Sequence, residues 1–157
     1  MAKHRKKRST IFENKKIMMS LFIAFIAFIA FACISTLVYW APQIGRTSAI
    51  IDQNNYTTGK FIEKTHNYVP TFGKYNSTRE SVVSYTIDGQ NLSVETFVWS
   101  PRPGRTMLLY VDKNDVHQAV TKAHREQAIV QTSLASFIVL VGLGLNAYIF
   151  IVNTKRK

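Results

Sequence analysis

The sequence predicts an α+β membrane protein in which two transmembrane helices flank a small extracytoplasmic antiparallel β domain. Three observations predict this class. Segments 17–39 and 129–152 contain no charged residue, and most of the net charge of +11 lies in the short tails outside them. The region between the two segments contains runs in which apolar and polar residues alternate, as they do in half-buried strands.

Each uncharged segment is long enough to cross a bilayer. The first has 23 residues and the second has 24, and a helix of this length rises about 34 Å against a hydrocarbon core of about 30 Å. A buried helix of a soluble protein is rarely so long and so apolar on every face. The alternative for the first segment is a cleaved signal peptide with the motif Ala30-Phe31-Ala32 before the single cysteine, Cys33. Its apolar run, however, exceeds the usual length of about 7–15 residues.

The basic residues predict that both termini are cytoplasmic. Tails 1–16 and 153–157 carry net charges of +6 and +3, whereas 40–128 carries +2. Short segments rich in Lys and Arg stay on the cytoplasmic side, so we expect a multi-pass protein of the plasma membrane, of the bacterial type. Because this role explains the basic run of the first tail, no nucleic-acid partner is expected. The side chains expected to contact lipid headgroups are Lys3, Arg5, Lys6, Lys7, Arg8, Lys15, Lys16, Lys155, Arg156 and Lys157.

Small residues four positions apart on each span permit close contact between helices. The expected packing pairs are Ser20 with Ala24, Ala32 with Thr36, Thr132 with Ser136, and Gly142 with Asn146. Asn146 is expected to face another helix, in the same chain or in a second copy, because an unpaired amide is costly in lipid. Neither span holds an ionisable group of the kind that proton-coupled transport uses, so packing is preferred over an ion path.

Four strands are predicted between the spans, at 57–63, 81–87, 91–99 and 106–111. Strands so short and closely linked form an antiparallel sheet, curled into a partial barrel. Asp88-Gly89, between the second and third strands, predicts a two-residue hairpin turn.

The rest of the loop predicts connecting segments and one helix. Segment 40–56 contains Pro42 and Gly45 and is interpreted as a connector, and 65–80 as a long loop. Apolar residues then recur at helical spacing from Val116, so the second helix is predicted to extend outside the membrane. The predicted regions are a tail at 1–16, a span at 17–39, a connector at 40–56, a β domain at 57–115, a membrane-proximal helix at 116–128, a span at 129–152 and a tail at 153–157.

Part of the β region resembles a bacterial family of two-helix membrane proteins of unknown function. The resemblance rests on the run Thr58-Gly59-Lys60-Phe61-Ile62, on Tyr85-Thr86-Ile87-Asp88-Gly89, and on a strand that follows Gly104 and ends near Tyr110 and Asp112. It covers about 60 residues. It implies a small extracytoplasmic β domain beside transmembrane helices, and it implies no reaction, substrate or cofactor.

No catalytic, metal or cofactor site is predicted. His66, His117 and His124 are expected to be solvated surface side chains, and the carboxylates are dispersed along the chain. The expected function is a non-catalytic one, in which the β domain contacts another membrane or extracytoplasmic protein. Such a protein would be an accessory subunit, an assembly factor or an immunity-type protein, with sheet edges and the 65–80 loop as contact surfaces.

Two alternatives to this function stay open, together with the possibility of a homo-oligomer. The first is an oligomeric pore or channel, for which Thr132, Ser136 and Asn146 offer a polar stripe. The second is a membrane-anchored enzyme.

Overall fold

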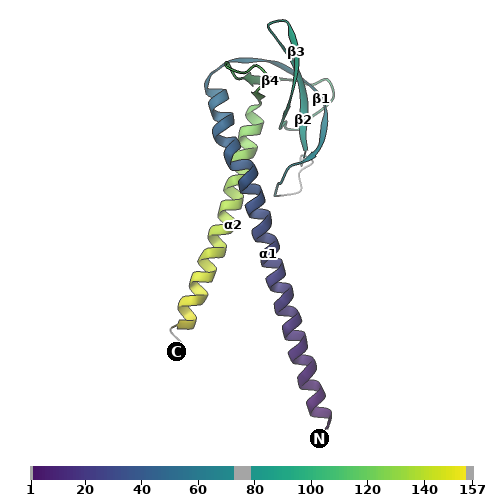
Figure 1. Cartoon of the computed structure of the whole chain (residues 1–157), viewed down its shortest axis with the longest axis vertical. Helices are drawn as coiled ribbons and strands as arrows, with labels where there is room; N and C mark the ends of the chain where they lie inside the picture. Colours follow the sequence, from purple (N-terminus) through teal and green to yellow (C-terminus); the bar gives the residue numbers. More distant parts are fainter. Residues whose placement is uncertain (1, 73–78, 155–157) are drawn as a thin grey trace.

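The protein consists of two long helices that cross near one end of the molecule, where they carry a curved antiparallel sheet (Figure 1). The structure, a computed structural model, describes residues 2–72 and 79–154. The helices are α1 (Ala2–Asp52) and α2 (Lys122–Thr154). The strands are β1 (Tyr56–Tyr68), β2 (Arg79–Ile87), β3 (Gln90–Thr96), β4 (Thr106–Val111) and β5 (Ala119–Val120). The predicted α+β architecture, with two apolar helices flanking a small antiparallel sheet, is confirmed.

Helix α1 runs without a break through the segment predicted as a connector, so that prediction is wrong between residue 40 and Asp52. Proline inside a helix costs about 3 kcal/mol and glycine about 1 kcal/mol relative to alanine. Pro42 and Gly45 both lie on the exposed side of the helix. The opposite side buries Trp40 and Ile50, which are 0% and 2% exposed. Burial of each such side chain contributes about 1.5–3 kcal/mol, which offsets the two unfavourable residues.

Helix α2 begins later than predicted, at Lys122 instead of near residue 116. Ala119 and Val120 instead form β5, which pairs with β4. Thr121 sets the start of the helix, because its Oγ1 accepts a hydrogen bond from the backbone N–H of His124 at 3.1 Å. Apolar spacing alone could not separate this short strand from a first helical turn, since both are consistent with the same residues.

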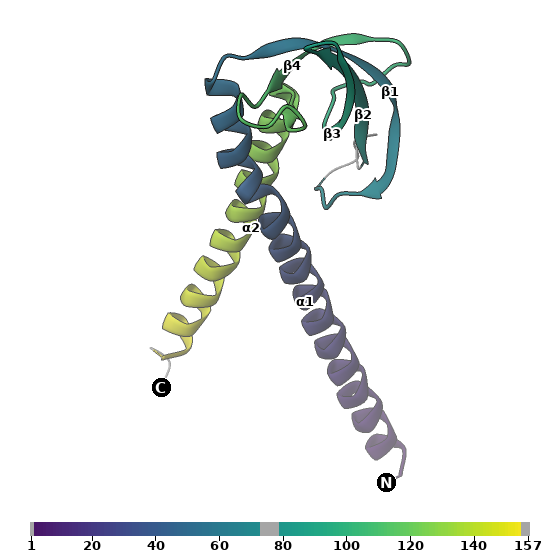
Figure 2. The same cartoon turned by 45° about the horizontal axis from the view of Figure 1, so that its top comes forward.

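The strands lie in the order β3-β2-β1-β4-β5, and each neighbouring pair is antiparallel. The predicted hairpin turn is confirmed, since Ile87 pairs with Gln90 and both turn residues have positive φ, 50° at Asp88 and 76° at Gly89. Positive φ at both positions defines the type I′ turn that matches the twist of the strands. The sheet curves into a half-barrel (Figure 2).

The first two strands are longer than predicted, so the expected 65–80 loop is wrong at its two ends, where 65–68 belong to β1 and 79–80 to β2. β1 continues to Tyr68, which pairs with Arg79 of β2, and residues 73–78 lie outside the described part of the chain. The register of this pair shifts between Phe61 and Glu63 and again between Lys64 and Tyr68. Such irregularities interrupt the alternation from which a strand is recognised in a sequence.

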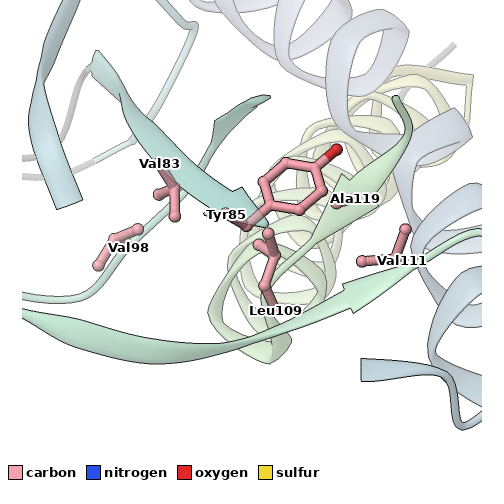
Figure 3. Packing of buried hydrophobic residues seen from close by; sticks show 6 residues of the cluster. All are labelled: Val83, Tyr85, Val98, Leu109, Val111 and Ala119. Carbon is pink, nitrogen blue, oxygen red and sulfur yellow. The ribbon is translucent and has the colours of Figure 1, made fainter. Parts of the chain in front are cut away.

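The main core fills the inside of the half-barrel (Figure 3). Its buried side chains come from β2, β4, β5 and the segment after β3, and they are Val83, Tyr85, Val98, Leu109, Val111 and Ala119. Gly59 of β1 has to be a glycine here, because a Cβ at this position would meet Cγ1 of Val83 at 2.5 Å. On the opposite face of β4, Tyr110 packs with Ile50 and Ile51 at the end of α1. The sheet is therefore attached directly to the helix end.

The helices pack along one seam close to the sheet and then diverge towards their free ends (Figures 1 and 2). The buried side chains of the seam recur at intervals of three, four or seven residues, which keeps them on one side of each helix. They are Cys33, Thr36, Trp40, Thr47 and Ile50 on α1, and His124, Ala128, Gln131 and Ala135 on α2. Large apolar side chains are exposed on the other sides of both helices and along the lengths where the helices diverge, from Ile17 to Val38 on α1 and from Ile129 to Ile151 on α2.

Candidate functional site: a buried polar junction between the helices and the sheet

Polar side chains from both helices and from the sheet meet where the seam reaches the strands. This region, called the junction below, consists of Tyr39, Trp40, Glu80, Thr96, Phe97, Thr121 and His124. Trp40 and Thr96 are 0% exposed, and His124 is 4% exposed. The junction is therefore an internal site.

His124 is the centre of the junction. Its ring nitrogen Nδ1 accepts a hydrogen bond from the backbone N–H of Phe97 at 3.1 Å and lies 3.2 Å from Oγ1 of Thr96. A nitrogen that accepts an N–H donor carries no proton, so the ring is the neutral form with its proton on Nε2. Burial, together with the charge of Arg46, lowers the pKa of His124 to about 4. At neutral pH the imidazole is therefore an uncharged acceptor.

The other ring nitrogen, Nε2, is buried and has no hydrogen-bond partner in the described part of the chain. The imidazole ring meets the indole of Trp40 edge-on, with 5.6 Å between ring centroids. The ring of His124 is thus held by one polar side and one aromatic side.

Two threonines connect the end of β3 to the start of α2. The backbone N–H of Thr121 donates to Oγ1 of Thr96 at 3.3 Å, and the Thr121 hydroxyl donates to the backbone carbonyl of Phe97. The Thr121 oxygen also caps α2 through the N–H of His124. These bonds satisfy backbone groups that a helix N-terminus would otherwise leave unpaired. The two hydroxyls therefore serve folding.

Glu80 brings a carboxyl group to the edge of the junction. The hydroxyl of Tyr39 donates to Oε1 of Glu80 at 3.1 Å, and the same oxygen lies 3.9 Å from Nδ1 of His124. Burial raises the pKa of the Glu80 carboxyl, while the hydrogen bond from Tyr39 acts in the opposite direction. The carboxyl group therefore has one neutral hydrogen-bond donor, Tyr39, and forms no ion pair with the ring of His124, whose Nδ1 carries no proton.

Two longer-range contacts hold the segment after β1 against both helices. The indole N–H of Trp40 donates to the backbone carbonyl of Pro70. Oε1 of Gln131 accepts the backbone N–H of Phe72 at 2.7 Å, and its Nε2 donates to the carbonyl of the same residue at 3.3 Å. Val69 is buried with Trp40 and Ala128. The end of the sheet nearest the free ends of the helices is therefore fixed at the seam.

The structure divides the eight predicted packing residues into two groups. Thr36 is buried in the seam, and Ala32, Thr132 and Ser136 are half-buried. The other four lie where the helices have diverged: Ser20, Ala24 and Asn146 are exposed, and a Cβ on Gly142 would meet no atom within 4 Å. The amide of Asn146 donates to the carbonyl of Gly142 in its own helix at 2.8 Å. Packing of Asn146 against the first span of the same chain is therefore wrong, because the helices separate before they reach it.

The predicted lipid-contacting side chains fall outside the description. Helix α1 includes residues 3–16, but their side chains are not described, and Lys155, Arg156 and Lys157 lie outside the described residues.

The expectation of solvated histidines is wrong for His124, which is buried, whereas His117 is exposed and precedes α2. The side chain of His66 is not described. Within 2–72 and 79–154, no group of three His, Cys, Asp or Glu side chains is arranged to hold a metal ion. The sequence signal that could have located His124 is the threonine three residues before it, since Thr121 and His124 stand in the spacing of an N-cap and its third helical residue.

Comparison of the chain with protein-family models, with curated proteins and with solved structures finds no match.

Proposed function

We propose that this protein is a non-catalytic integral membrane protein that holds its β domain outside the cell membrane for interaction with another protein. Both termini are then cytoplasmic, and the protein acts as an accessory subunit, an assembly factor or an immunity-type protein. One observation carries the proposal, namely the exposed apolar surface of the two helices. Phe28 and Val38 of α1 are 70% and 72% exposed, and Leu140 and Tyr148 of α2 are each 66% exposed. Apolar surface of this extent is stable in lipid and not in water.

The position of the sheet supports the same proposal. Both helices are long and apolar enough to span a bilayer, and the described part of the β domain packs against the C-terminal part of α1 and the N-terminal part of α2. The apolar segments of both helices therefore keep exposed surface that lipid could cover. The basic tails at the opposite ends favour cytoplasmic termini.

The junction supports a structural role in preference to a catalytic one. The hydroxyls of Thr96 and Thr121 and the Nδ1 of His124 are engaged with backbone groups of the chain itself. A catalytic group has to reach a substrate, and a group 4% exposed, such as His124, cannot do so without opening the fold. The junction instead couples the sheet rigidly to the helices.

The outer face of β1 and β4 is the surface that we propose for the partner protein. Tyr56 and Leu108 are 58% and 47% exposed there, and Ile62, at the register shift of β1, is 49% exposed. The pairing of Thr58 with Leu108 places these side chains on neighbouring strands. Exposed aromatic and aliphatic side chains on a rigid sheet are common at protein interfaces.

The topology is tested by thiol labelling of the full chain with Cys33 replaced by alanine. Single cysteines are introduced at Ser9, Ser93 and Thr154, and intact cells are treated with a membrane-impermeant thiol reagent. The proposal expects labelling at Ser93 alone, with Ser9 and Thr154 labelled only after lysis. Labelling of Ser9 or Thr154 in intact cells would reject the proposed orientation.

The partner surface is tested by photo-crosslinking in the cells that make the protein. A crosslinking amino acid at Tyr56 or Leu108 is expected to trap one defined protein, whereas the same group at the exposed Asn91 of β3 is not. Identical products from all three positions would count against this face.

A further inference from the structure

One end of the sheet lies beside the helices rather than beyond them, as Figures 1 and 2 show for the start of β2 and the end of β1. The segment 69–72, which follows β1, is attached there at three points. Trp40 binds the carbonyl of Pro70, Gln131 binds both backbone groups of Phe72, and Val69 is buried against Trp40 and Ala128.

Segment 69–72 is attached to the helices close to the point where their exposed apolar surface ends. The exposed large apolar side chains of α1 end at Val38, and those of α2 begin at Ile129. Trp40 stands two residues beyond the first limit, and Gln131 stands two residues inside the second. At a rise of about 1.5 Å per residue, both contacts lie within about 3 Å of the boundary. The headgroup layer on each side of the hydrocarbon core is about 5–7 Å thick.

We propose that segment 69–72 lies in the headgroup layer of the outer leaflet and contacts phospholipid directly. The inference rests on the proposed function, because it requires the two helices to be in a bilayer. It adds a second lipid-binding surface, which belongs to the β domain and not to a span.

The chemistry of the segment fits phospholipid as its occupant. The phenyl ring of Phe72 and the side chain of Thr71 are half-buried, so both retain accessible surface. Aromatic side chains are enriched at this depth of the bilayer. Backbone groups enter a region poor in water only when they are hydrogen-bonded. The chain meets this condition at Pro70 and Phe72, where Trp40 and Gln131 supply the partners.

A lipid contact at this end fixes the direction of the whole sheet. β2 leads away from it over nine residues to the Asp88-Gly89 turn. At about 3.3 Å per residue, the turn lies up to about 30 Å from this end along the strand. The domain is held at two depths, by its helices and by segment 69–72.

The test uses the full chain with Cys33 replaced by alanine, reconstituted in phosphatidylcholine vesicles. Single cysteines at Phe72, at Thr71, at Ser93 of β3 and at Phe28 of α1 are labelled with the same environment-sensitive fluorophore. The vesicles contain lipids that carry a nitroxide quencher either on the headgroup or deep in the acyl chain. We expect the headgroup nitroxide to quench the label at Phe72 or Thr71, with a blue shift in emission, and to leave Ser93 unquenched. The acyl-chain nitroxide is expected to quench Phe28.

The position in the span separates failure of this inference from failure of the proposed function. If Phe28 is quenched while both Phe72 and Thr71 behave like Ser93, the lipid contact of segment 69–72 is refuted and the membrane anchor stands. If Phe28 is not quenched by either nitroxide, the membrane anchor itself is refuted, and this inference with it. Using two neighbouring labelling sites ensures that local disturbance by one substitution does not decide the result.

Discussion

The imidazole of His124, in the first turn of α2, accepts a hydrogen bond from the backbone N–H of Phe97, which directly follows β3. This bond joins two elements that are 27 residues apart in the chain. It is buried, so neither partner has access to water if the other is removed. The packing of the junction therefore depends on this pair.

Replacement of His124 by alanine is expected to lower the free energy of unfolding by about 1–3 kcal/mol, since it leaves the N–H of Phe97 unpaired in a buried site. His124→Asn is expected to recover part of the loss, because its side-chain oxygen stands at the position of Nδ1. Thermal unfolding of the full chain in detergent micelles measures both variants. His117→Ala, at an exposed position, is the matched control and should unfold like the unmodified chain. Equal stability of His124→Ala and the control would show that the bond contributes nothing.

Acid is expected to destabilise the protein through the same residue. The pKa of His124 falls from its ordinary value of 6.5 to about 4 in the folded chain. Between these values the unfolded chain binds a proton that the folded chain does not, so this contribution is full above pH 6.5 and is lost as pH falls towards 4. The loss amounts to about 3 kcal/mol.

The measurement for this second prediction is the pH dependence of unfolding. The variant His124→Asn, which cannot titrate, should lose less stability than the unmodified chain over the same interval. Glu80 acts in the opposite sense, because its raised pKa favours the folded chain as pH falls. Glu80→Gln should therefore steepen the acid loss, and a parallel pH profile for all three proteins would contradict the prediction.

Thr121→Val is expected to cost about 1–2 kcal/mol, because it removes the cap of α2. The hydrogen bond from the Thr121 hydroxyl to the carbonyl of Phe97 is lost as well. Thr121→Ser keeps the hydroxyl and should retain most of the stability. The exposed Thr58→Val is the comparison for a change of the same shape without a buried hydrogen bond. Chemical denaturation ranks the stability of the unmodified chain and the three variants. If Thr58→Val lost as much stability as Thr121→Val, the loss in Thr121→Val could not be attributed to the helix cap.

Gly59→Ala is expected to destabilise the sheet by about 1–3 kcal/mol through overpacking. The added methyl would lie 2.5 Å from Cγ1 of Val83. Combining it with Val83→Ala removes the colliding atom, so the double variant should be more stable than the sum of the two single changes predicts. A double-mutant cycle of unfolding free energies measures this coupling. Simple additivity would show that the two residues do not meet.

The parts of the fold that sequence predicted best are those set by local chemistry. Asp88-Gly89 specifies its turn because the two residues tolerate positive φ, and the strands on either side show clear alternation. The two apolar helices were equally predictable, because each contains more than 20 consecutive uncharged residues. Continuation of α1 through Pro42 was not predictable, because it depends on tertiary burial of Trp40 and Ile50 on the other side of the helix.

The junction was missed for a related reason. A histidine carries no sequence mark of burial, and the partners of His124 come from β3 and β2, distant in the chain. Gln131 likewise looks like an ordinary polar residue within an apolar segment until the backbone of Phe72 is brought beside it. For Asn146 the sequence predicted a contact with another helix, whereas its amide donates to the carbonyl of Gly142 in its own helix.

Helix α1 is continuous from its N-terminal half to Ile50, where it packs against Tyr110 of the sheet. This continuity affects how the β domain would encounter a partner protein. A domain on a flexible linker samples a volume set by the reach of that linker. Here only residues 53–55 separate α1 from β1, and Gln53 and Asn55 are hydrogen-bonded to the segment 111–113, so with the helices in a bilayer the domain keeps one height and one inclination. Encounter would then be a search in two dimensions, by lateral diffusion along the membrane, with the domain already turned to the angle at which it binds.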